Sequence, residues 1–124
     1  MKVNWRAFCH GKQLSLDGNE VTVNFENGRH HRVCIEETEE TIELHALVAK
    51  AAAVKTVADL PLRIWRHNRA SQLVGFRQNP RGAVVANGWL AKAGLSKEEF
   101  LAVVRRVAAE SDRFEFLLTG RDAE

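Results

Sequence analysis

The amino-acid sequence predicts an α+β domain in which antiparallel strands come first and a long helix comes last. Three observations support this fold class. Apolar and polar residues alternate through much of the first half, which is the period of half-buried strands. A second pair of apolar segments flanks a Pro-Arg-Gly turn, and the last third has apolar residues at helical spacing. The expected order is therefore an antiparallel β-meander, a helix, a β-hairpin and a long C-terminal helix.

Length and composition bound the class of protein. The chain has 124 residues, 45% hydrophobic and 27% charged, which predicts one domain over residues 1–124 with a core of its own. Its two cysteines, Cys9 and Cys34, make no disulfide framework and are expected to be reduced thiols in a cytoplasmic protein. Residues 1–10 lack the apolar core of a signal peptide, and no apolar run approaches the roughly 20 residues of a membrane span. We therefore expect no membrane association.

The first strands are placed by the parity of their apolar positions. Apolar residues are odd-numbered in both 21–25 and 33–35, which flank Glu26-Asn27-Gly28. A two-residue Asn-Gly turn would place the two sets on opposite faces, whereas a three-residue loop with Gly28 left-handed keeps them on one face. We therefore predict a hairpin with a G1 bulge. Before it, a strand over residues 14–16 is expected to pair back across a turn at Asp17-Gly18.

The following turn is predicted to be four residues long, over residues 37–40. In that register the apolar positions become even-numbered along the next strand, and all four strands share one apolar face. His31 lies at the rim of this face and is expected to be a packed, hydrogen-bonded histidine. The expected cross-strand pairs are Ile35 with Ile42, Val33 with Leu44, and His31 with Ala46.

Residues 49–56 are compatible with either a helix or a strand, because alanine favours the first and valine tolerates the second. A helix is predicted after Asp59, which is a good N-cap residue, with Pro61 in the first turn. On a helical wheel the apolar residues lie toward one side, namely Leu60, Ile64 and Trp65. The opposite side carries what we call the arginine stripe, namely Arg63, Arg66 and Arg69.

A second hairpin is predicted from residues 73–77 and 83–90, joined by a type I turn and a bulge at Asn79-Pro80-Arg81-Gly82. Both of its faces are apolar. One face carries Val74, Phe76, Val84 and Ala86, and the other carries Leu73, Val85 and Trp89. Such a hairpin needs cover on both sides, which we expect a helix and a partner subunit to supply.

The last helix has the clearest signals. Ser96 and Glu99 form a capping box, and Gly120 can end the helix. The residues at helical spacing are Phe100, Val103, Val104, Val107, Phe114, Leu117 and Leu118. The N-terminal segment is left open, because helical spacing would group Trp5 with Phe8 and Cys9 whereas strand alternation would group Trp5 with Ala7 and Cys9.

Several phrases of the sequence together resemble a known family. They are Leu60-Pro61-Leu62-Arg63-Ile64-Trp65-Arg66-His67-Asn68-Arg69, Leu73-Val74-Gly75-Phe76-Arg77, Trp89-Leu90-Ala91-Lys92-Ala93-Gly94-Leu95-Ser96, and Ser111-Asp112-Arg113-Phe114-Glu115. With the order of elements over roughly residues 20 to 120, they are similar to the bacterial type III secretion chaperone-like superfamily, in its YbjN-like branch. The resemblance implies a compact and often dimeric α+β fold that binds a polypeptide rather than catalysing a reaction.

Charge is divided along the chain, although the formal net charge is only +2. Between Asp59 and Glu98 there is no acidic residue, whereas glutamates crowd residues 36–43. A divided surface favours binding to partners. We therefore predict a polypeptide-binding adaptor that forms a homodimer, with these partner-binding residues: Arg63, Arg66, Arg69, Arg77, Val85 and Trp89. A less favoured alternative is nucleic-acid binding by the arginine stripe, with Trp65 or Trp89 stacking on a base.

The polar face of the meander brings a cysteine, a histidine and glutamates close together. The predicted register places Cys34 between Glu20 and Glu43 and makes His45 its diagonal neighbour. A Cys–His pair can form an activated thiolate, and with a glutamate it can hold zinc. No spacing motif supports either reading, so we expect a solvated face with no catalytic residue, metal or cofactor. A cysteine-dependent enzyme is the least favoured alternative.

Overall fold

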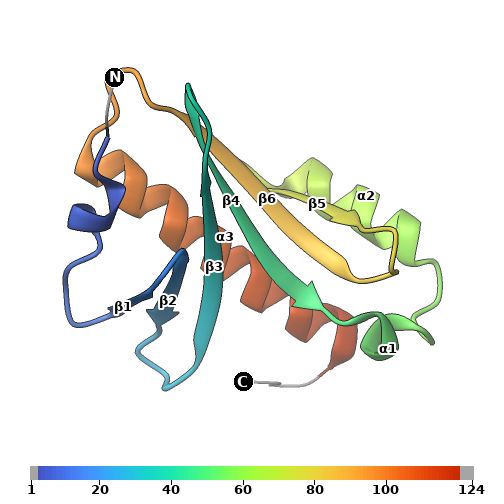
Figure 1. Cartoon of the computed structure of the whole chain (residues 1–124). Helices are drawn as coiled ribbons and strands as arrows, with labels where there is room; N and C mark the ends of the chain where they lie inside the picture. The colour runs from blue at the N-terminus through green and yellow to red at the C-terminus, as the bar shows by residue number, and fades with distance from the viewer. Residues whose placement is uncertain (1–2, 121–124) are drawn as a thin grey trace.

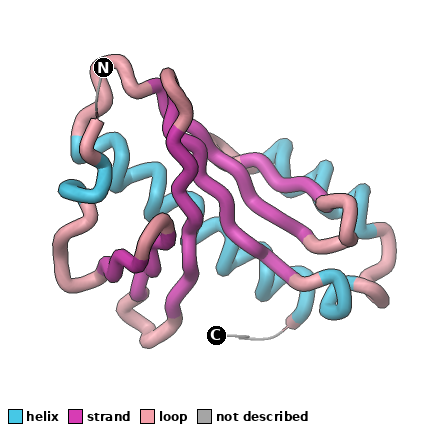
Figure 2. Tube along the Cα trace, viewed as in Figure 1, coloured by secondary structure: helices cyan, strands magenta, loops and turns pink. Residues whose placement is uncertain are grey.

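The protein, described by a computed structural model over residues 3–120, has one six-stranded sheet with helices packed behind it (Figure 1). Residues 1, 2 and 121–124 of the predicted domain lie outside this range. Neighbouring strands are antiparallel and follow the order β1-β2-β3-β4-β6-β5 (Figure 2). The elements are η1 (Trp5–Phe8), β1 (Leu14–Asp17), β2 (Glu20–Asn24), β3 (His30–Glu37), β4 (Thr41–Ala49), α1 (Ala51–Val54), α2 (Leu60–Ala70), β5 (Gly75–Gln78), β6 (Val84–Ala91) and α3 (Lys97–Thr119).

The α+β class and the predicted order of meander, helix, hairpin and long helix are confirmed. The segment that was compatible with helix or strand forms the short helix α1. Near the N-terminus, η1 buries Trp5, and Cys9 is buried just after it, which agrees with the helical alternative. Within residues 3–120, no helix combines the length and apolar character that crossing a bilayer requires.

The first hairpin has the predicted bulged loop. The amide of Gly28 donates to the carbonyl of Phe25 at 3.1 Å, and the amide of Phe25 donates to the carbonyl of Arg29 at 2.7 Å. Gly28 has φ of 86°, a left-handed conformation that glycine adopts without steric cost. Val21 therefore faces Val33 across the strands, so that odd positions pair with odd positions and share the buried face.

The turn between β3 and β4 is shorter than predicted. It is a two-residue turn at Glu39-Glu40, closed by Thr38 and Thr41. The amide of Thr38 donates to the carbonyl of Thr41 at 2.9 Å, and the amide of Thr41 donates to the Thr38 hydroxyl at 2.9 Å. This local pairing of two threonines accounts for the tighter turn.

The tighter turn shifts the predicted register by two residues. Ile35 faces Leu44 rather than Ile42, so the predicted pairs of Val33 with Leu44 and His31 with Ala46 are also wrong. Because the shift is an even number, the buried side chains stay on the same face, and Val33, Ile35, Ile42 and Leu44 are all at most 2% exposed.

Helix α3 covers the apolar face of the sheet along its length (Figure 1). Its capping box is present, and Gly120 ends it with φ of 68°, as predicted. Phe100 is fully buried, with the ring of Trp5 6.0 Å away and that of Phe8 5.7 Å away. Burial of each such large side chain contributes about 1.5–3 kcal/mol. Leu117, predicted on the apolar side, is 48% exposed, because it lies beside the helix face with which Phe114 and Leu118 pack into the core.

Helix α2 lies along the edge strand β5 (Figure 1). The side chain of Asn68 accepts from the amide of Phe76 at 2.7 Å and donates to its carbonyl at 2.8 Å, so α2 occupies main-chain groups of that edge. The ring of His67 stacks on Phe114 with centroids 4.0 Å apart. Leu60 and Ile64 are buried, but Trp65 is 55% exposed, because the contact with the edge is narrow. Its predicted place on the apolar side is wrong.

Two details of the α2–β5 region also differ from prediction. Asp59 has left-handed φ of 55° and makes no side-chain cap, although its carbonyl accepts from the amide of Arg63 at 2.9 Å. Leu73 precedes β5, has φ of 69° and is 68% exposed, because the chain turns there from α2 into the strand. The turn of the second hairpin is as predicted, with Gly82 at φ of 91° and its amide donating to the carbonyl of Asn79 at 2.9 Å.

The buried imidazole of His67 predicts a loss of stability in mild acid. Burial lowers the pKa of His67, while Glu110 raises it and Arg113 lowers it. The unfolded chain therefore binds the proton more tightly than the folded chain. The resulting stability is fully present above about pH 6.5 and is lost as the pH falls through the lowered folded pKa.

We expect His67→Phe to reduce the loss of urea-unfolding midpoint between about pH 7.5 and about pH 5.5. Phenylalanine keeps the stacking partner and removes the titration. His10→Gln, which removes a histidine at an exposed position, is the control. An unchanged pH dependence in His67→Phe would contradict the assignment.

Candidate functional site

The sheet face opposite α3 carries three of the predicted partner-binding residues, Arg77, Val85 and Trp89. Figure 1 shows α2 and α3 behind the sheet, so the described part of the chain places no long helix in front of it. Trp89 is 67% exposed and Leu47 on β4 is 46% exposed, while Val85 is half-buried and faces Leu47 across the strands. We call this surface the open face. It presents apolar side chains that folding within residues 3–120 leaves in contact with solvent.

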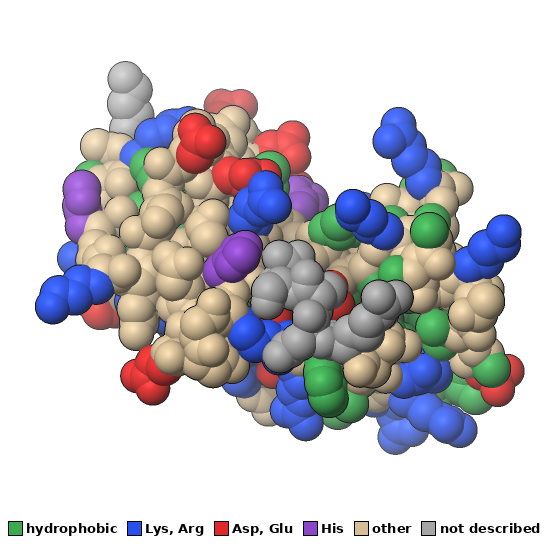
Figure 3. Space-filling model, turned by 90° about the horizontal axis from the view of Figure 1, so that it is seen from below, with side chains coloured by type: hydrophobic (Ala, Val, Ile, Leu, Met, Phe, Trp, Pro, Cys, Tyr) green, Lys and Arg blue, Asp and Glu red, His purple; other side chains and the backbone are tan. Residues whose placement is uncertain are grey.

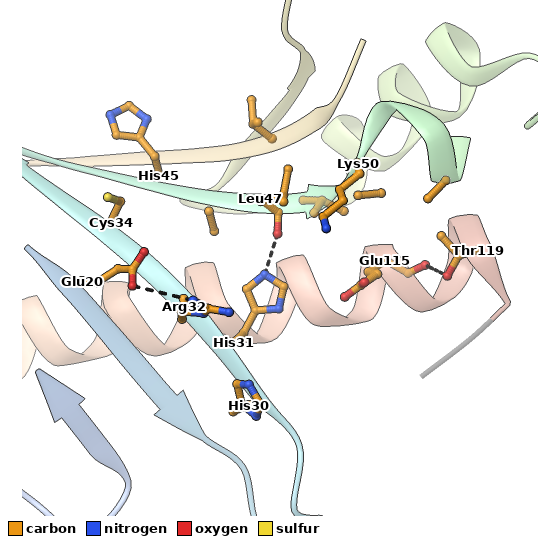
Figure 4. A pocket seen from close by; sticks show the side chains of 15 residues that line it. Glu20, His30, His31, Arg32, Cys34, His45, Leu47, Lys50, Glu115 and Thr119 are labelled. Atoms are coloured by element: carbon orange, nitrogen blue, oxygen red, sulfur yellow. Dashed lines mark hydrogen bonds and ion pairs between the residues drawn. The ribbon is translucent and has the colours of Figure 1, made fainter. Parts of the chain in front are cut away.

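The sheet divides at one end of the open face. Pairing of β3 with β4 stops at Cys34 and His45, although β2 follows β3 as far as His30. Beyond that point β4 turns toward β6, with a bulge between Leu47 and Ala49. The two strands therefore separate, as Figure 4 shows. Between them lies a hollow of about 660 Å³ lined by residues of β3 and β4 together with Val85, Glu115 and Thr119.

His31 bridges the two separating strands. It is 6% exposed, and its Nε2 lies 2.7 Å from the carbonyl oxygen of Leu47, so Nε2 carries the proton and donates (Figure 4). This confirms the expected packed, hydrogen-bonded histidine. Its Nδ1 lies 3.9 Å from Oδ1 of Asp112, which accepts from Arg29 at 3.0 Å. The network ties the β2–β3 hairpin to α3 where the strand ladder ends.

His31, Asp112 and Glu115 form a group whose ligand atoms lie within 4.8 Å of one another. Such a group can in principle hold a metal ion. The guanidinium of Arg29, 3.0 Å from Asp112, already supplies positive charge there. This group therefore reads best as a structural ion network.

The arginine stripe does not act as one unit. Arg63 is half-buried, and its guanidinium donates to the carbonyl of Leu117 at 2.6 Å near the C-terminal end of α3. Arg66 and Arg69 are exposed, and the guanidinium of Arg69 lies over the ring of Trp65, 5.0 Å from its centroid. Basic side chains gather where α2, β5 and β6 lie (Figure 3). The six predicted partner-binding residues are thus divided between α2 and the open face.

Cys34 and His45 face each other directly, rather than diagonally as predicted. The cause is the two-residue shift in register. Nδ1 of His45 lies 2.7 Å from Nδ2 of Asn87, and Nε2 lies 3.5 Å from a carboxylate oxygen of Glu36 and 3.8 Å from one of Glu43. Both ring nitrogens are therefore engaged, which disfavours activation of the Cys34 thiol by this imidazole.

The cysteines are both free thiols in the described part of the chain. Cys9 is buried, and burial raises the pKa of its thiol although Arg6 lowers it. Cys34 is exposed on the open face. The predicted cytoplasmic location stays a prediction.

The glutamate-rich turn of the β3–β4 hairpin contacts Lys92, which begins the loop between β6 and α3. Nζ of Lys92 lies 2.6 Å from Oε2 of Glu37, and the side chain of Lys92 is only 9% exposed. The amide of Lys92 also donates to the carbonyl of Glu40 at 2.9 Å. The hydrogen bond from Lys92 is the main cause that lowers the pKa of Glu37. This contact ties the β3–β4 turn to the end of β6.

Comparison with known proteins gives the fold. No protein-family model and no curated protein matches the sequence. A chain of the heterodimeric ExoU–SpcU complex from the type III secretion system of Pseudomonas aeruginosa is 16% identical, with TM-score 0.66, and the match covers 98% of this chain and 100% of that chain. The chain has the type III secretion chaperone-like fold.

Two further structures share this chaperone-like fold. A chain of the HopA1–SchA chaperone–effector complex is 12% identical, with TM-score 0.52, covering 94% of this chain and 87% of that chain. YbjN from E. coli is 19% identical, with TM-score 0.51, covering 89% and 81%. The resemblance seen in the sequence is thereby confirmed for the fold. At these identities the likeness concerns architecture and does not transfer a ligand.

Sequence reasoning missed the hollow and most of the contacts at its rim. The alternation of residues 30–35 predicts a regular strand, and no local signal marks where β3 and β4 separate. His31 was the only hint, as a polar residue at an apolar position. Leu47 was missed, although its odd-numbered position on β4 already places it on the polar face, where it meets Val85.

The Glu37–Lys92 contact predicts a measurable stabilisation. We expect Glu37→Gln to lower the free energy of unfolding by about 0.5–1 kcal/mol at neutral pH, because it leaves the ammonium group of Lys92 without its charged acceptor, while solvent around the 36% exposed Glu37 side chain screens the pair. The stabilisation is present above the ordinary glutamate pKa and is lost as the pH falls through the lowered folded pKa of Glu37. Urea unfolding measures it. Glu39→Gln, in the exposed turn, is the matched control and should change little; equal stability of both variants would contradict the assignment.

Proposed function

We propose that the protein is a non-catalytic adaptor that holds a polypeptide partner on its open face and forms a homodimer. The observation that carries the proposal is the exposure of Trp89 and Leu47 on a sheet face that no long helix of residues 3–120 covers, with Leu47 lining the hollow where β3 and β4 separate. Exposed apolar side chains that lie together are typical of protein interaction sites. Aromatic residues with a polar surround are frequent anchors of such interfaces.

The shared fold supports a binding role. HopA1–SchA is a chaperone–effector complex and ExoU–SpcU is a heterodimeric complex, so this architecture occurs in proteins that hold another chain. The proposal for the present protein concerns the class of partner, a polypeptide.

The charge of the surface suggests which polypeptides bind. Arg77 lies on the open face opposite Val85, and its guanidinium donates to Asn87 at 3.2 Å. Arg66 and Arg69 extend the basic character along α2. We therefore propose acidic and apolar segments as preferred partners. Arg63 contributes by holding α2 to the end of α3.

A second copy of the chain is the proposed partner in the homodimer. The open face carries apolar residues together with the acidic Glu36 and Glu43 at its β3–β4 end and the basic Arg77 on β5. Two copies packed in opposite directions would bring the acidic part of one against the basic part of the other. The apolar side chains Leu47, Val85 and Trp89 would then be covered, so a second copy and a polypeptide partner compete for the open face.

The adaptor proposal is tested with peptides and by sedimentation. Two peptide sets of about 12 residues alternate apolar residues with either acidic or basic residues, a length suited to an extended segment on a sheet. We expect the acidic set to bind more tightly in fluorescence anisotropy, and Trp89→Ser to weaken binding by about tenfold or more. Leu62→Ser, at an exposed leucine of α2, is the control.

The same samples report the dimer. Sedimentation velocity over a wide concentration range should show a dimer that Trp89→Ser weakens and Leu62→Ser does not. A strict monomer that binds neither peptide set would overturn the proposed function. A monomer that binds the acidic set would remove only the homodimer.

A second candidate function is nucleic-acid binding on α2. It is favoured by Trp65, which is 55% exposed beside Arg66 and Arg69 and could stack on an unpaired base. Filter binding of single-stranded DNA should then show a steep salt dependence that Arg66→Ala and Arg69→Ala each reduce. Absence of retention at low salt would reject this candidate.

A further inference from the structure

Four side chains with metal-binding atoms project from one block of the open face. They come from two neighbouring cross-strand pairs, Cys34 with His45 and Glu36 with Glu43. Residues two apart on a strand point to the same side, so the four side chains leave the sheet from the corners of one rectangle, about 5 Å across the strands and about 7 Å along them. The two-residue turn between β3 and β4 creates this block, because the register that it sets places His45, rather than the predicted Glu43, opposite Cys34.

The distances suit a single small cation. Nε2 of His45 lies 3.5 Å from Oε2 of Glu36 and 3.8 Å from Oε1 of Glu43, and the three ligand atoms lie within 4.8 Å of one another. Two nitrogen or oxygen ligands at about 2.0–2.2 Å from a tetrahedral zinc ion are about 3.3–3.6 Å apart. The side chains of this site therefore need movements of only a few tenths of an ångström to about an ångström. Cys34 lies exposed at the fourth corner, opposite His45, and its side chain would have to rotate to bring the thiol to the same space.

Charge also favours a cation there. Glu36 and Glu43 face each other directly, and like charges in facing positions destabilise a strand pair. The imidazole N–H of His45 lies between the two carboxylates. Other charged groups near the block include Glu20 and Arg32, which pair with each other at 4.0 Å beside Cys34, and Arg77, which donates to Asn87 beside His45.

We propose that Cys34, Glu36, Glu43 and His45 form a binding site for zinc or a chemically similar divalent transition metal. One thiolate, one imidazole and two carboxylates are ligands that suit zinc, whereas magnesium and calcium avoid sulfur and nitrogen. The site goes beyond the adaptor role, since it does not depend on a polypeptide partner. Binding at Cys34 converts its thiol to a thiolate and releases the proton to solvent.

Asn87 is the positioning residue of this site. Arg77 can only donate, so Oδ1 of Asn87 accepts from it at 3.2 Å and Nδ2 faces Nδ1 of His45 at 2.7 Å. The imidazole proton then sits on Nε2. A metal on Nε2 moves that proton to Nδ1, and the amide of Asn87 turns so that Oδ1 accepts from it, while the exposed Arg77 side chain withdraws. A metal-bound histidine commonly donates its second ring N–H to such an oxygen.

This second contact yields a variant that should strengthen the site. Asn87→Asp places a carboxylate, which cannot donate to Nδ1 and accepts from it without turning. We expect zinc affinity to rise by about tenfold or more, and Asn87→Leu to lower it by about 10- to 100-fold. A role of Asn87 in packing alone would make both substitutions neutral or harmful to metal binding.

The experiment titrates zinc into the whole protein, reduced by a phosphine and freed of metal by chelation. Isothermal titration calorimetry should give one ion per chain, and Cys34→Ser or His45→Gln should lower the affinity by at least about tenfold. Cobalt titration should give a thiolate-to-cobalt absorption band that Cys34→Ser abolishes. Cys9→Ser and Glu39→Gln are the controls and should leave both signals unchanged, with circular dichroism confirming the fold of each variant.

Other outcomes overturn the proposal. Zinc binding that survives Cys34→Ser and His45→Gln but is lost in Asp112→Asn would place the ion at His31, Asp112 and Glu115. A cobalt spectrum without a thiolate band, or an affinity unchanged by Asn87→Asp, would remove the assigned ligand set. No binding by calorimetry at protein concentrations that reveal weak zinc sites would exclude the site altogether.

Discussion

Burial of one sheet face under α3 is the constraint on which the rest of the structure depends. Side chains alternate between faces along a strand, so the apolar residues can share one core only if each turn preserves their parity. The bulged loop at Gly28 does this with an extra residue, and the Thr38–Thr41 turn does it with an even shift. Once this face is buried, the polar side chains of the strands are forced onto the open face, where Cys34, His45 and Trp89 lie.

The same sheet is regular at one end and divided at the other, and the division shapes the surface. At the regular end, Glu37 and Lys92 hold the β3–β4 turn beside the loop that leads to α3. At the divided end, His31 donates to the carbonyl of Leu47 and takes over a role that a ladder hydrogen bond would otherwise have. Pairing of β3 with β4 thus ends beside Leu47 and Val85, whose side chains are available to a partner.

Metal binding and partner binding would occupy adjacent parts of the open face. Glu43 faces Trp89 across β4 and β6, and His45 faces Asn87 in the next pair. An ion held by Glu43 and His45 would neutralise carboxylates next to the most exposed aromatic residue of the sheet. The proposed metal site can therefore influence how an acidic partner meets this surface, although each role has its own observations and its own test.

Local sequence patterns determined much of the architecture by themselves: the parity of Val21, Val23 and Val33, the Ser96–Glu99 capping box, and the resemblance to secretion chaperones all agree with the fold. These features depend on neighbouring residues and on which face is apolar. Only the tertiary structure decided that Cys34 faces His45, that Trp65 points to solvent and that Arg63 binds the end of α3. Alternation along a strand is the same in two registers that differ by two residues, and a helical wheel does not tell how much of a helix its neighbour covers. The site therefore depends on contacts between segments that are distant in the sequence.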